Sequence, residues 1–361
     1  MSDFEVPILK VDEVLDHPNA DRLSLIKIRD YITISAKLED GSHRYKKDDL
    51  VIYVPENSIV PENLLKEGFW NEDKNKGMLS GKNGDVVKPV RLRGTLSEGI
   101  LFPLEKLMGL DVSSILNISK YEPPIPANFA GDVVNIGSSK TVHYDIENIK
   151  KYPDLFTEND DVVVTEKGHG TFCCFGYHPD IYDDDLYLGD RFVYSKGLGK
   201  QGLIFKYNTK NIESNIYCKI IYGKYQDVLQ RISRFYDRRV PIYIMGEIMG
   251  PGVQDLSYGL EDKDIYCFDV YVGNPGEGGY LPAHKRDEFF TQHELKKVPE
   301  LYRGRFDIKK ILELTNGKTK FSDVDQIREG VVISSAYGER KILKSVSEDY
   351  LFRKGSTTEY Q

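Results

Sequence analysis

Before residue 121, hydrophobic and polar residues form short runs that do not repeat with the period of an α-helix. The runs are rich in β-branched and aromatic residues, and turn-forming residues separate them. About five such strands within roughly 110 residues favour a small β-barrel or sandwich. An Asn-Gly turn signal lies at Asn83 and Gly84. The predicted strands include residues 23–28, 51–54, 86–92 and 99–102.

After residue 128 the pattern again indicates mainly strands, with fewer helical segments. The strands do not alternate regularly with helices, which argues against a doubly wound parallel sheet. We therefore expect an α+β chain whose second part has antiparallel sheets with flanking helices. The predicted strands are 162–165, 192–195, 203–206, 242–245, 265–272 and 330–334, and the predicted helices are 216–236, 285–293 and 308–314.

A proline-rich segment divides the chain. Pro123, Pro124 and Pro126 favour an extended linker, because proline fixes φ and cannot continue a helix. We expect an N-terminal domain over 1–122, a linker over 123–128 and a second domain over 129–361. A length of 361 residues suits two domains.

Composition narrows the class of protein. Hydrophobic residues make up 40% and charged residues 29%, which excludes a mainly disordered or fibrous chain. No apolar run approaches the roughly 20 residues that span a bilayer, and residues 1–10 show no secretory signal. The four cysteines form no C-x-x-C pair, so neither a zinc site nor a disulfide framework is expected. We expect an intracellular, cytoplasmic protein with no membrane association.

The net charge of −8 argues against attraction of a polyanion by bulk charge. A nucleic-acid surface would therefore be a local patch, and two basic stretches are candidates; the alternative is that both are ordinary solvated faces. The first contains Arg191, Lys196, Lys200, Lys206 and Lys210, and the second contains Arg231, Arg234, Arg238 and Arg239.

The segment 197–202 satisfies G-x-G-x-x-G literally. A dinucleotide-binding fingerprint needs a helix after it, whereas residues 203–207 predict a strand. A protein-kinase glycine-rich loop is excluded, because kinase chemistry needs the H-R-D and D-F-G motifs and the chain has neither. We expect a flexible basic hairpin here.

The most informative segment is 162–171, where a strand ends in Glu166, Lys167, Gly168, His169 and Gly170. The glycines let the backbone come close to a ligand. A lysine held at such a turn becomes a nucleophile once it loses its proton. A solvated turn lysine is the ordinary alternative for this segment alone.

Four later segments carry further candidates. Glu247 is expected at a strand end between glycines, Phe268 lies in a strand beside Asp269, and Glu329 opens a strand before a glycine. Lys341 and Lys344 lie beside the last predicted strand. Each alone is equally consistent with a core aromatic or an exposed charge.

Together and in this order, residues 129–354 resemble the covalent nucleotidyltransferase superfamily of ATP-dependent ligases and capping enzymes. Segments 166–171, 246–252 and 267–270 resemble the RNA ligases in particular. Segments 17–22, 51–55 and 90–103 resemble an OB-fold of the tRNA-binding type. An OB-like domain placed first is similar to one subgroup of RNA ligases.

The resemblance implies roles for individual residues. Lys167 matches the nucleophile that attacks the α-phosphate of ATP, Glu166 the reader of the adenine edge, and Phe268 the aromatic that stacks on adenine. Glu247 matches a carboxylate near the ribose and is a second candidate ligand for a metal. Glu329 matches a carboxylate that binds the divalent metal, Mg²⁺ or Mn²⁺.

Three further matches are basic. Lys344 matches a phosphate-contacting lysine, and Lys196 matches a position where relatives usually have arginine. His169 matches a histidine of RNA ligases whose step stays unassigned. Many relatives carry K-x-K at the last motif, whereas this chain has Ile342 two positions before Lys344.

The function implied is that of a monomeric ATP-dependent RNA ligase. It would join 3′-hydroxyl and 5′-phosphate ends, in nicked duplex RNA, through lysyl-AMP and RNA-adenylate intermediates. The alternatives are a capping-type guanylyltransferase, which domain order and the histidine disfavour, and a non-catalytic RNA-binding protein with a decayed nucleotidyltransferase fold.

Overall fold

The computed structural model describes residues 4–104, 117–121, 131–181, 190–236 and 239–353. The chain divides into two compact units, residues 2–122 and 123–361. The proline-rich segment 123–128, expected as a linker, lies outside the described residues. No helix of the described part is long and apolar enough to cross a membrane.

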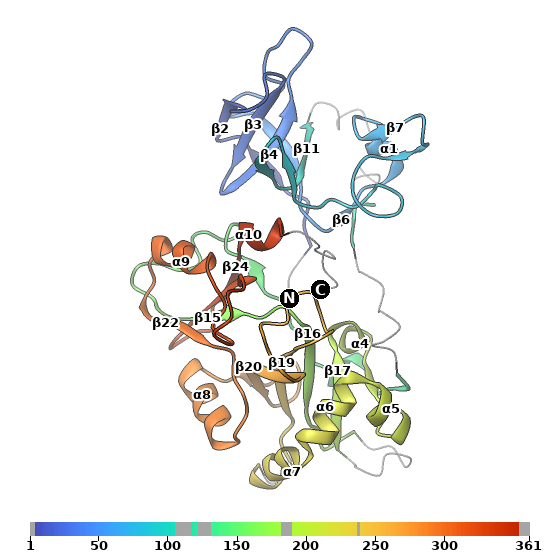
Figure 1. The fold of residues 1–361 in the computed structure, drawn as a ribbon, viewed down its shortest axis with the longest axis vertical. Helices are drawn as coiled ribbons and strands as arrows, with labels where there is room; N and C mark the ends of the chain where they lie inside the picture. The colour runs from blue at the N-terminus through green and yellow to red at the C-terminus, as the bar shows by residue number, and fades with distance from the viewer. Residues whose placement is uncertain (1–3, 105–116, 122–130, 182–189, 237–238, 354–361) are drawn as a thin grey trace. The chain divides into compact units, whose positions relative to one another are not determined.

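The N-terminal unit is built from short strands (Figure 1). Its elements are β1 (Ile8–Lys10), β2 (Glu13–Asp16), β3 (Leu23–Ile28), β4 (Tyr31–Ala36), β5 (Leu50–Val54), β6 (Ser58–Ile59), α1 (Glu62–Leu65), β7 (Trp70–Asn71), β8 (Lys76–Gly77), β9 (Val90–Leu92), β10 (Thr95–Ser97), β11 (Ile100–Pro103) and β12 (Ser119–Lys120). Two antiparallel three-stranded sheets, β1-β5-β11 and β2-β3-β4, make up its main part.

Alternating burial along β3 shows how this unit forms its core. Ile26 and Ile28 are buried, whereas Lys27 between them is exposed. The predicted strand 86–92 is shorter in the structure, because Pro89 has no N–H to donate to a ladder and only Val90–Leu92 forms a strand. His17 lies 3.1 Å from the Leu92 carbonyl oxygen, so two of the OB-like motifs meet.

The second unit contains two five-stranded sheets, ordered β14-β24-β23-β15-β22 and β17-β16-β19-β20-β21. All pairs in them are antiparallel except β14 with β24. The predicted α+β class is confirmed. The strands are β13 (Val133–Asn135), β14 (Glu147–Asn148), β15 (Asp161–Lys167), β16 (Thr171–Tyr177), β17 (Arg191–Ser195), β18 (Leu203–Phe205), β19 (Ile242–Met249), β20 (Asp264–Val272), β21 (Gly279–Tyr280), β22 (Glu300–Arg305), β23 (Gly330–Ser335) and β24 (Ile342–Val346).

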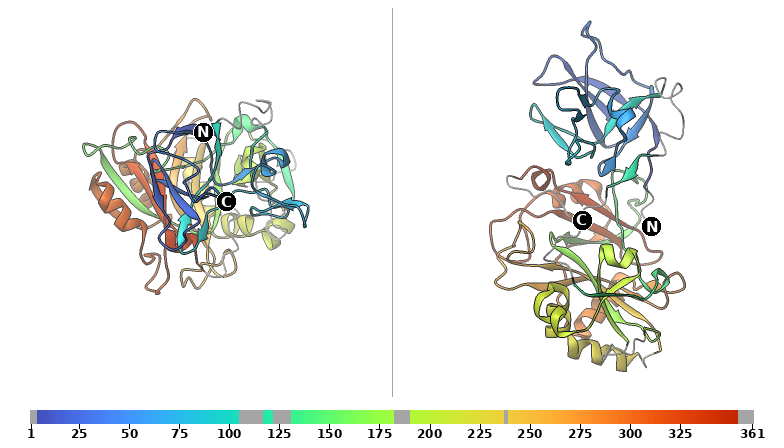
Figure 2. Two further views of the ribbon diagram at one scale, coloured as in Figure 1. Left: turned by 90° about the horizontal axis from the view of Figure 1, so that it is seen from above. Right: turned by 90° about the vertical axis from the view of Figure 1, so that its right-hand side faces the viewer.

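Several helices of this unit pack against the two sheets. The elements are η2 (Ser138–Lys140), α4 (Lys196–Lys200), α5 (Thr209–Ser214), α6 (Ile216–Lys224), α7 (Gln226–Phe235), α8 (Ala283–Gln292), α9 (Ile308–Thr315) and α10 (Glu348–Leu351). The helices α6 and α7, yellow in Figures 1 and 2, pack against β17 and β16. The helix α9 packs against β23 and β24, while α8 packs against β20.

The predictions of one long helix and of one hairpin were wrong. The single helix expected over 216–236 is divided at Tyr225, whose backbone leaves helical geometry while its hydroxyl donates to Asp264 at 2.9 Å. The hairpin expected over 197–202 is instead the short helix α4, which begins after Ser195 and is capped by the hydroxyl of that serine. The strand predicted after it is confirmed as β18.

The two sheets of the second unit are joined by the turn between β15 and β16. Gly170 is required in this turn, because a Cβ there would lie 2.1 Å from the Ile248 carbonyl oxygen. Gly168 is similarly close to the Met249 side chain. The turn therefore packs directly against the end of β19, and it places Lys167 at the junction of the sheets.

Candidate active site

Lys167 is the last residue of β15 and forms an ion pair with Glu329. The antiparallel register places Lys167 opposite Gly330, so Glu329 lies at the next position along the partner strand. The two side chains are mostly buried, and Lys167 Nζ lies 2.5 Å from Glu329 Oε1. The strand pairing therefore brings the predicted nucleophile and the predicted metal ligand together.

Lys344 lies on the same sheet face as Lys167. It is directly opposite Val332 of β23, and Val332 is directly opposite Thr165 of β15. Directly opposed residues of an antiparallel pair share a face, as do residues two apart along a strand. Lys344, Val332 and Thr165 therefore share a face, and Lys167, two residues after Thr165, lies on that face as well.

Glu247 approaches the same place from the second sheet. Its carboxylate Oε1 accepts a hydrogen bond of 3.2 Å from the Gly170 N–H. Burial raises the pKa of Glu247 to about 8; Glu329 adds to the rise, while the charge of Lys167 opposes it. The expected strand end is wrong, since β19 continues through Met249 and Glu247 lies within it.

Glu166 faces the opposite side of the strand from Lys167 and is buried. Its Oε2 accepts a hydrogen bond from the Lys320 N–H at 2.7 Å. Among the described residues, Oε1 has no hydrogen-bond partner, and burial raises the pKa of this carboxyl group. A buried acceptor without a partner suits a ligand that brings its own N–H donor.

Phe268 lies in an aromatic cluster next to the Glu247 strand. It occupies an irregularity of the β19–β20 pairing, and its ring centroid lies 5.2 Å from that of Tyr144 and 6.2 Å from that of Phe172. Phe172 is directly opposite Glu247. The structure therefore brings an aromatic surface beside the carboxylate, and Tyr144 and Phe172 were not predicted from the sequence.

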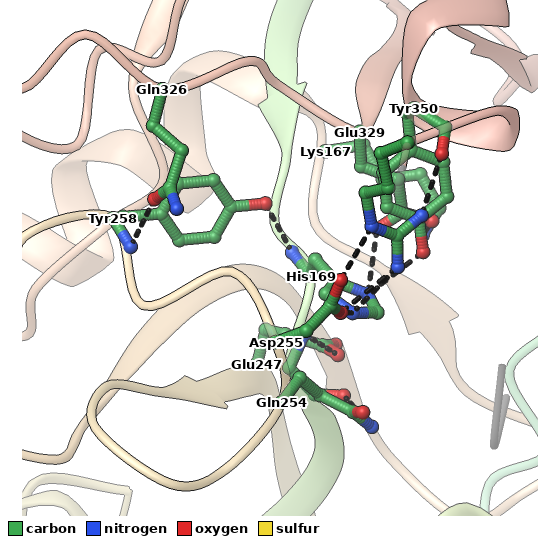
Figure 3. A network of polar contacts seen from close by, with 11 residues as sticks. Lys167, His169, Glu247, Gln254, Asp255, Tyr258, Gln326, Glu329 and Tyr350 are labelled. Atoms are coloured by element: carbon green, nitrogen blue, oxygen red, sulfur yellow. Dashed lines mark hydrogen bonds and ion pairs between the residues drawn. The ribbon is translucent and has the colours of Figure 1, made fainter. Parts of the chain in front are cut away.

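His169 is buried two residues after Lys167, and Figure 3 shows its polar contacts. Its Nε2 lies 2.7 Å from Asp255 Oδ1, and its Nδ1 lies 2.8 Å from the Tyr350 hydroxyl. The Tyr258 hydroxyl accepts a 2.9 Å hydrogen bond from the His169 backbone N–H. Burial lowers the pKa of His169, an effect that Glu329 and Asp255 oppose.

Arg353 fastens the helix α10 to this network. Its Nε and Nη2 donate to Asp255 at 2.6 and 2.9 Å, and its Nη1 donates to the Tyr350 carbonyl at 2.6 Å. The guanidinium also lies 3.8 Å from the centre of the Tyr350 ring. Asp255, Tyr258, Tyr350 and Arg353 lie outside the motifs considered in the sequence, and no local pattern marks them.

Lys196 and the basic stretches are partly neutralised by acids from elsewhere in the chain. Lys196 lies 2.6 Å from Asp145, yet it is close enough to Glu247 to oppose the rise in that pKa. Lys210 pairs with Asp132 at 2.7 Å. In the second stretch, Arg231 pairs with Glu294 at 3.2 Å, and Arg238 lies outside the described residues.

Lys341 lies on the other side of the sheet from Lys344. It pairs with Asp160 at 2.9 Å and lies over the Phe156 ring, in the region covered by α9. Ile342 packs against the core of the other sheet.

The fold and the site together define an enzyme class with an N-terminal OB-fold domain and a two-sheet domain that presents a lysine at a strand end. The family model for RNA ligase matches residues 160–346, and an OB-fold domain model matches residues 6–104. The chain belongs to the RNA ligase family. A comparison with curated proteins gives no significant match.

Solved structures of an RNA ligase from Naegleria gruberi share the fold over nearly the whole chain. The ligase with PPi is 21% identical, with a TM-score of 0.73, and the match covers 97% of this chain and 98% of that one. A glutamate-to-alanine variant with AMP and Mn is 21% identical, with a TM-score of 0.74 and the same coverage. A lysine-to-alanine variant with ATP and Mn is 22% identical, with a TM-score of 0.72, covering 95% of this chain and 97% of that one.

Proposed function

We propose that this protein is an ATP-dependent RNA ligase that seals nicks in duplex RNA as a monomer. Family membership supports the ligase reaction, and the Naegleria gruberi ligase structures with ATP, AMP and Mn support the choice of nucleotide and metal. The observation that carries the proposal is the placement of Lys167 at a strand end, paired with Glu329, on one sheet face with Lys344.

Lys167 is the proposed nucleophile. In its neutral form, Nζ attacks the α-phosphorus of ATP, a nitrogen–phosphorus bond forms, and the bond to the β-phosphate oxygen breaks to release pyrophosphate. The AMP group then passes to an RNA 5′-phosphate, and a 3′-hydroxyl displaces AMP. Lys344 and Lys196 are proposed to neutralise phosphate oxygens, since phosphoryl transfer gains mainly from positioning and charge neutralisation.

The nucleoside part of ATP fits the remaining residues. Glu166 Oε1, which has no hydrogen-bond partner among the described residues, offers an acceptor to the adenine amino group, and the Phe268 cluster offers a face for stacking. Glu247 would lie near the ribose. These contacts are proposals supported by the unsatisfied buried acceptor and by the resemblance of the motifs.

A divalent cation fits Glu329, with Glu247 as a second candidate ligand. The described residues contain no cluster of three His, Cys, Asp or Glu side chains suited to a metal. Mg²⁺ commonly takes only one or two carboxylates and completes its shell with water and substrate phosphates, so a sparse site is expected. Bound Mg²⁺ or Mn²⁺ would supply charge neutralisation on the phosphate oxygens.

The test uses the intact protein with [α-³²P]ATP and, separately, [α-³²P]GTP, followed by denaturing gel electrophoresis. Label from ATP that stays on the protein, and sealing of a nicked RNA duplex, are the expected results. Label from GTP alone would favour the capping-type guanylyltransferase. Absence of label from both nucleotides would favour a non-catalytic RNA-binding protein.

The substrate form has its own test. Nicked duplex, splinted and single-stranded RNA are compared at equal end concentrations, with the nicked duplex expected to be sealed fastest. Faster sealing of single strands would contradict the nick preference while leaving the ligase assignment in place. Sedimentation with and without RNA measures the oligomeric state.

A further inference from the structure

Tyr258 touches the turn that carries the proposed nucleophile, although it lies 89 residues away from His169 in sequence. Its hydroxyl accepts the hydrogen bond of the His169 backbone N–H at 2.9 Å, in the middle of the turn between β15 and β16. The side chain is fully buried. Figure 3 shows the Tyr258 ring pointing toward His169 from a separate loop.

The backbone of Tyr258 is in a conformation that a bulky residue rarely adopts. Its φ is +53°, in the left-handed region, where non-glycine residues persist only when their surroundings hold them. The Tyr258 N–H donates to Gln326 Oε1 at 2.6 Å, and its carbonyl accepts from the Ser322 hydroxyl at 2.5 Å. The ring also packs on Phe321, with centroids 5.1 Å apart.

The loop of residues 320–326, which contacts Tyr258, also contacts Glu166, the residue proposed to bind adenine. Lys320, two residues before Ser322, donates its backbone N–H to Glu166 Oε2. The same stretch therefore contacts Glu166 on one side of Lys167 and, through Tyr258, His169 on the other side. Two groups next to the nucleophile in sequence are held by one connected set of hydrogen bonds.

Other contacts hold the next residue of the turn. Gly170 donates to Glu247 and accepts from Gln254 Nε2 at 3.2 Å. The His169 N–H points in a different direction, and among the contacts of the described residues its acceptor is Tyr258. Removing this hydroxyl would leave a buried N–H without its acceptor, so the turn would shift to satisfy it.

We propose that Tyr258 is a positioning residue for the ligase reaction, whose hydroxyl fixes the turn after Lys167 and thereby the place of the lysine Nζ. The inference rests on the proposed function of Lys167 and adds a residue to it. The contact of Tyr258 with the turn is made to the backbone of His169. It acts through the backbone of His169, so its effect falls on the rate of lysyl-AMP formation rather than on ATP affinity.

Tyr258→Phe tests the proposal, because it removes the hydroxyl and keeps the ring. A control exists in Tyr194, which is equally buried; its hydroxyl accepts from the Val142 N–H at 2.9 Å and donates to the Val142 carbonyl oxygen at 3.2 Å. Tyr194→Phe also leaves a buried N–H without its acceptor, but far from the turn in the hydrogen-bond network. Tyr194→Phe should lose at least as much melting temperature as Tyr258→Phe, because it removes a donated as well as an accepted hydrogen bond.

Single-turnover labelling with ATP at several concentrations distinguishes an effect on the position of Lys167 from a general loss of stability. A displacement of about 1 Å can cost on the order of 100-fold in rate, so Tyr258→Phe should lower the maximal labelling rate about 10- to 100-fold, with half-saturation by ATP within about 2-fold of wild type. Tyr194→Phe should label at the wild-type rate. A wild-type rate in Tyr258→Phe, or an equal loss in Tyr194→Phe, would overturn the inference.

A second pair of variants tests the same proposal if Tyr258→Phe folds poorly. Gln326→Leu removes the acceptor that holds the Tyr258 backbone, whereas Gln326→Glu keeps an acceptor oxygen. Gln326→Leu should lower the maximal labelling rate as Tyr258→Phe does, whereas Gln326→Glu should keep most of the wild-type rate. Equal rates in the two variants would count against the inference. A wild-type protein that takes no label contradicts the proposed function itself, which distinguishes the two failures.

Discussion

The ammonium group of Lys167 lies 2.5 Å from a Glu329 oxygen, across an antiparallel strand pair and 162 residues away in sequence. The contact joins the proposed nucleophile and the proposed metal ligand, two residues that lie in separate segments of the sequence. The variants below test the two assignments separately.

The first prediction concerns Lys167 as the nucleophile. Lys167→Ala should abolish transfer of label from [α-³²P]ATP to the protein, and Lys167→Arg should fail as well, because a guanidinium stays protonated. Lys341→Ala is the matched control, since Lys341 is held by Asp160 on the other side of the sheet. Retained labelling in Lys167→Ala would remove the assignment.

The second prediction concerns Glu329. Glu329→Gln keeps the size of the side chain but removes its charge, so sealing of nicked RNA at limiting Mg²⁺ should fall on the order of 100-fold. Glu313→Gln, which changes an exposed carboxylate on α9, should have no such effect. If Glu329→Gln seals at the wild-type rate when Mg²⁺ is scarce, Glu329 is not a metal ligand.

The third prediction uses the pKa of Glu247, which burial raises from 4.5 to about 8. The folded protein then binds this proton more tightly than the unfolded chain, so wild-type stability should fall as pH rises from about 4.5 to about 8. Glu247→Gln has no such proton to lose. Over this pH range its free energy of unfolding should therefore rise relative to that of the wild type by roughly a few kcal/mol. Thermal or urea unfolding in metal-free buffer at pH 5 and pH 8.5 measures the difference, and a pH-independent difference would contradict it.

The fourth prediction concerns the pairing of Asp255 with Arg353. This two-hydrogen-bond contact anchors the end of α10 beside His169. Asp255→Asn, Arg353→Met and the double variant form a thermodynamic cycle, for which we expect a coupling of about 1–3 kcal/mol in the free energy of unfolding. The Asp287–Arg303 pair offers a matched control cycle away from His169. Additive effects of Asp255→Asn and Arg353→Met would show that the contact contributes nothing.

The fifth prediction separates RNA binding from nucleotide chemistry. The residues proposed for adenylylation all follow residue 131, so a truncated protein that begins at residue 127 should still form lysyl-AMP if it folds. It should seal a pre-adenylylated nicked RNA poorly, because OB-fold surfaces grip nucleic acid. Arg91 and Arg93, exposed in and after β9, are the proposed contacts. Equal sealing by the full-length and truncated proteins would contradict a role of the N-terminal domain in RNA binding. Loss of labelling in a folded truncated protein would show that this domain takes part in lysyl-AMP formation.

The sequence by itself determined the class of fold and the chemistry-bearing segments. Strand periodicity and the scarcity of regular strand–helix alternation predicted the α+β class, and most predicted strands and helices lie where the structure has them. The segment around Lys167 and the order of the later motifs indicated the RNA ligase family. These features are local, because side-chain alternation and motif spacing are written along a few consecutive residues.

Only the tertiary structure decided which distant residues meet. The register of β15 with β23 pairs Lys167 with Glu329, and the fold places Tyr258 and Asp255 against His169. The structure also directs Lys341 away from Lys344, although three positions separate them in sequence. Contacts of this kind depend on strand register and loop packing over many tens of residues, which no local pattern encodes.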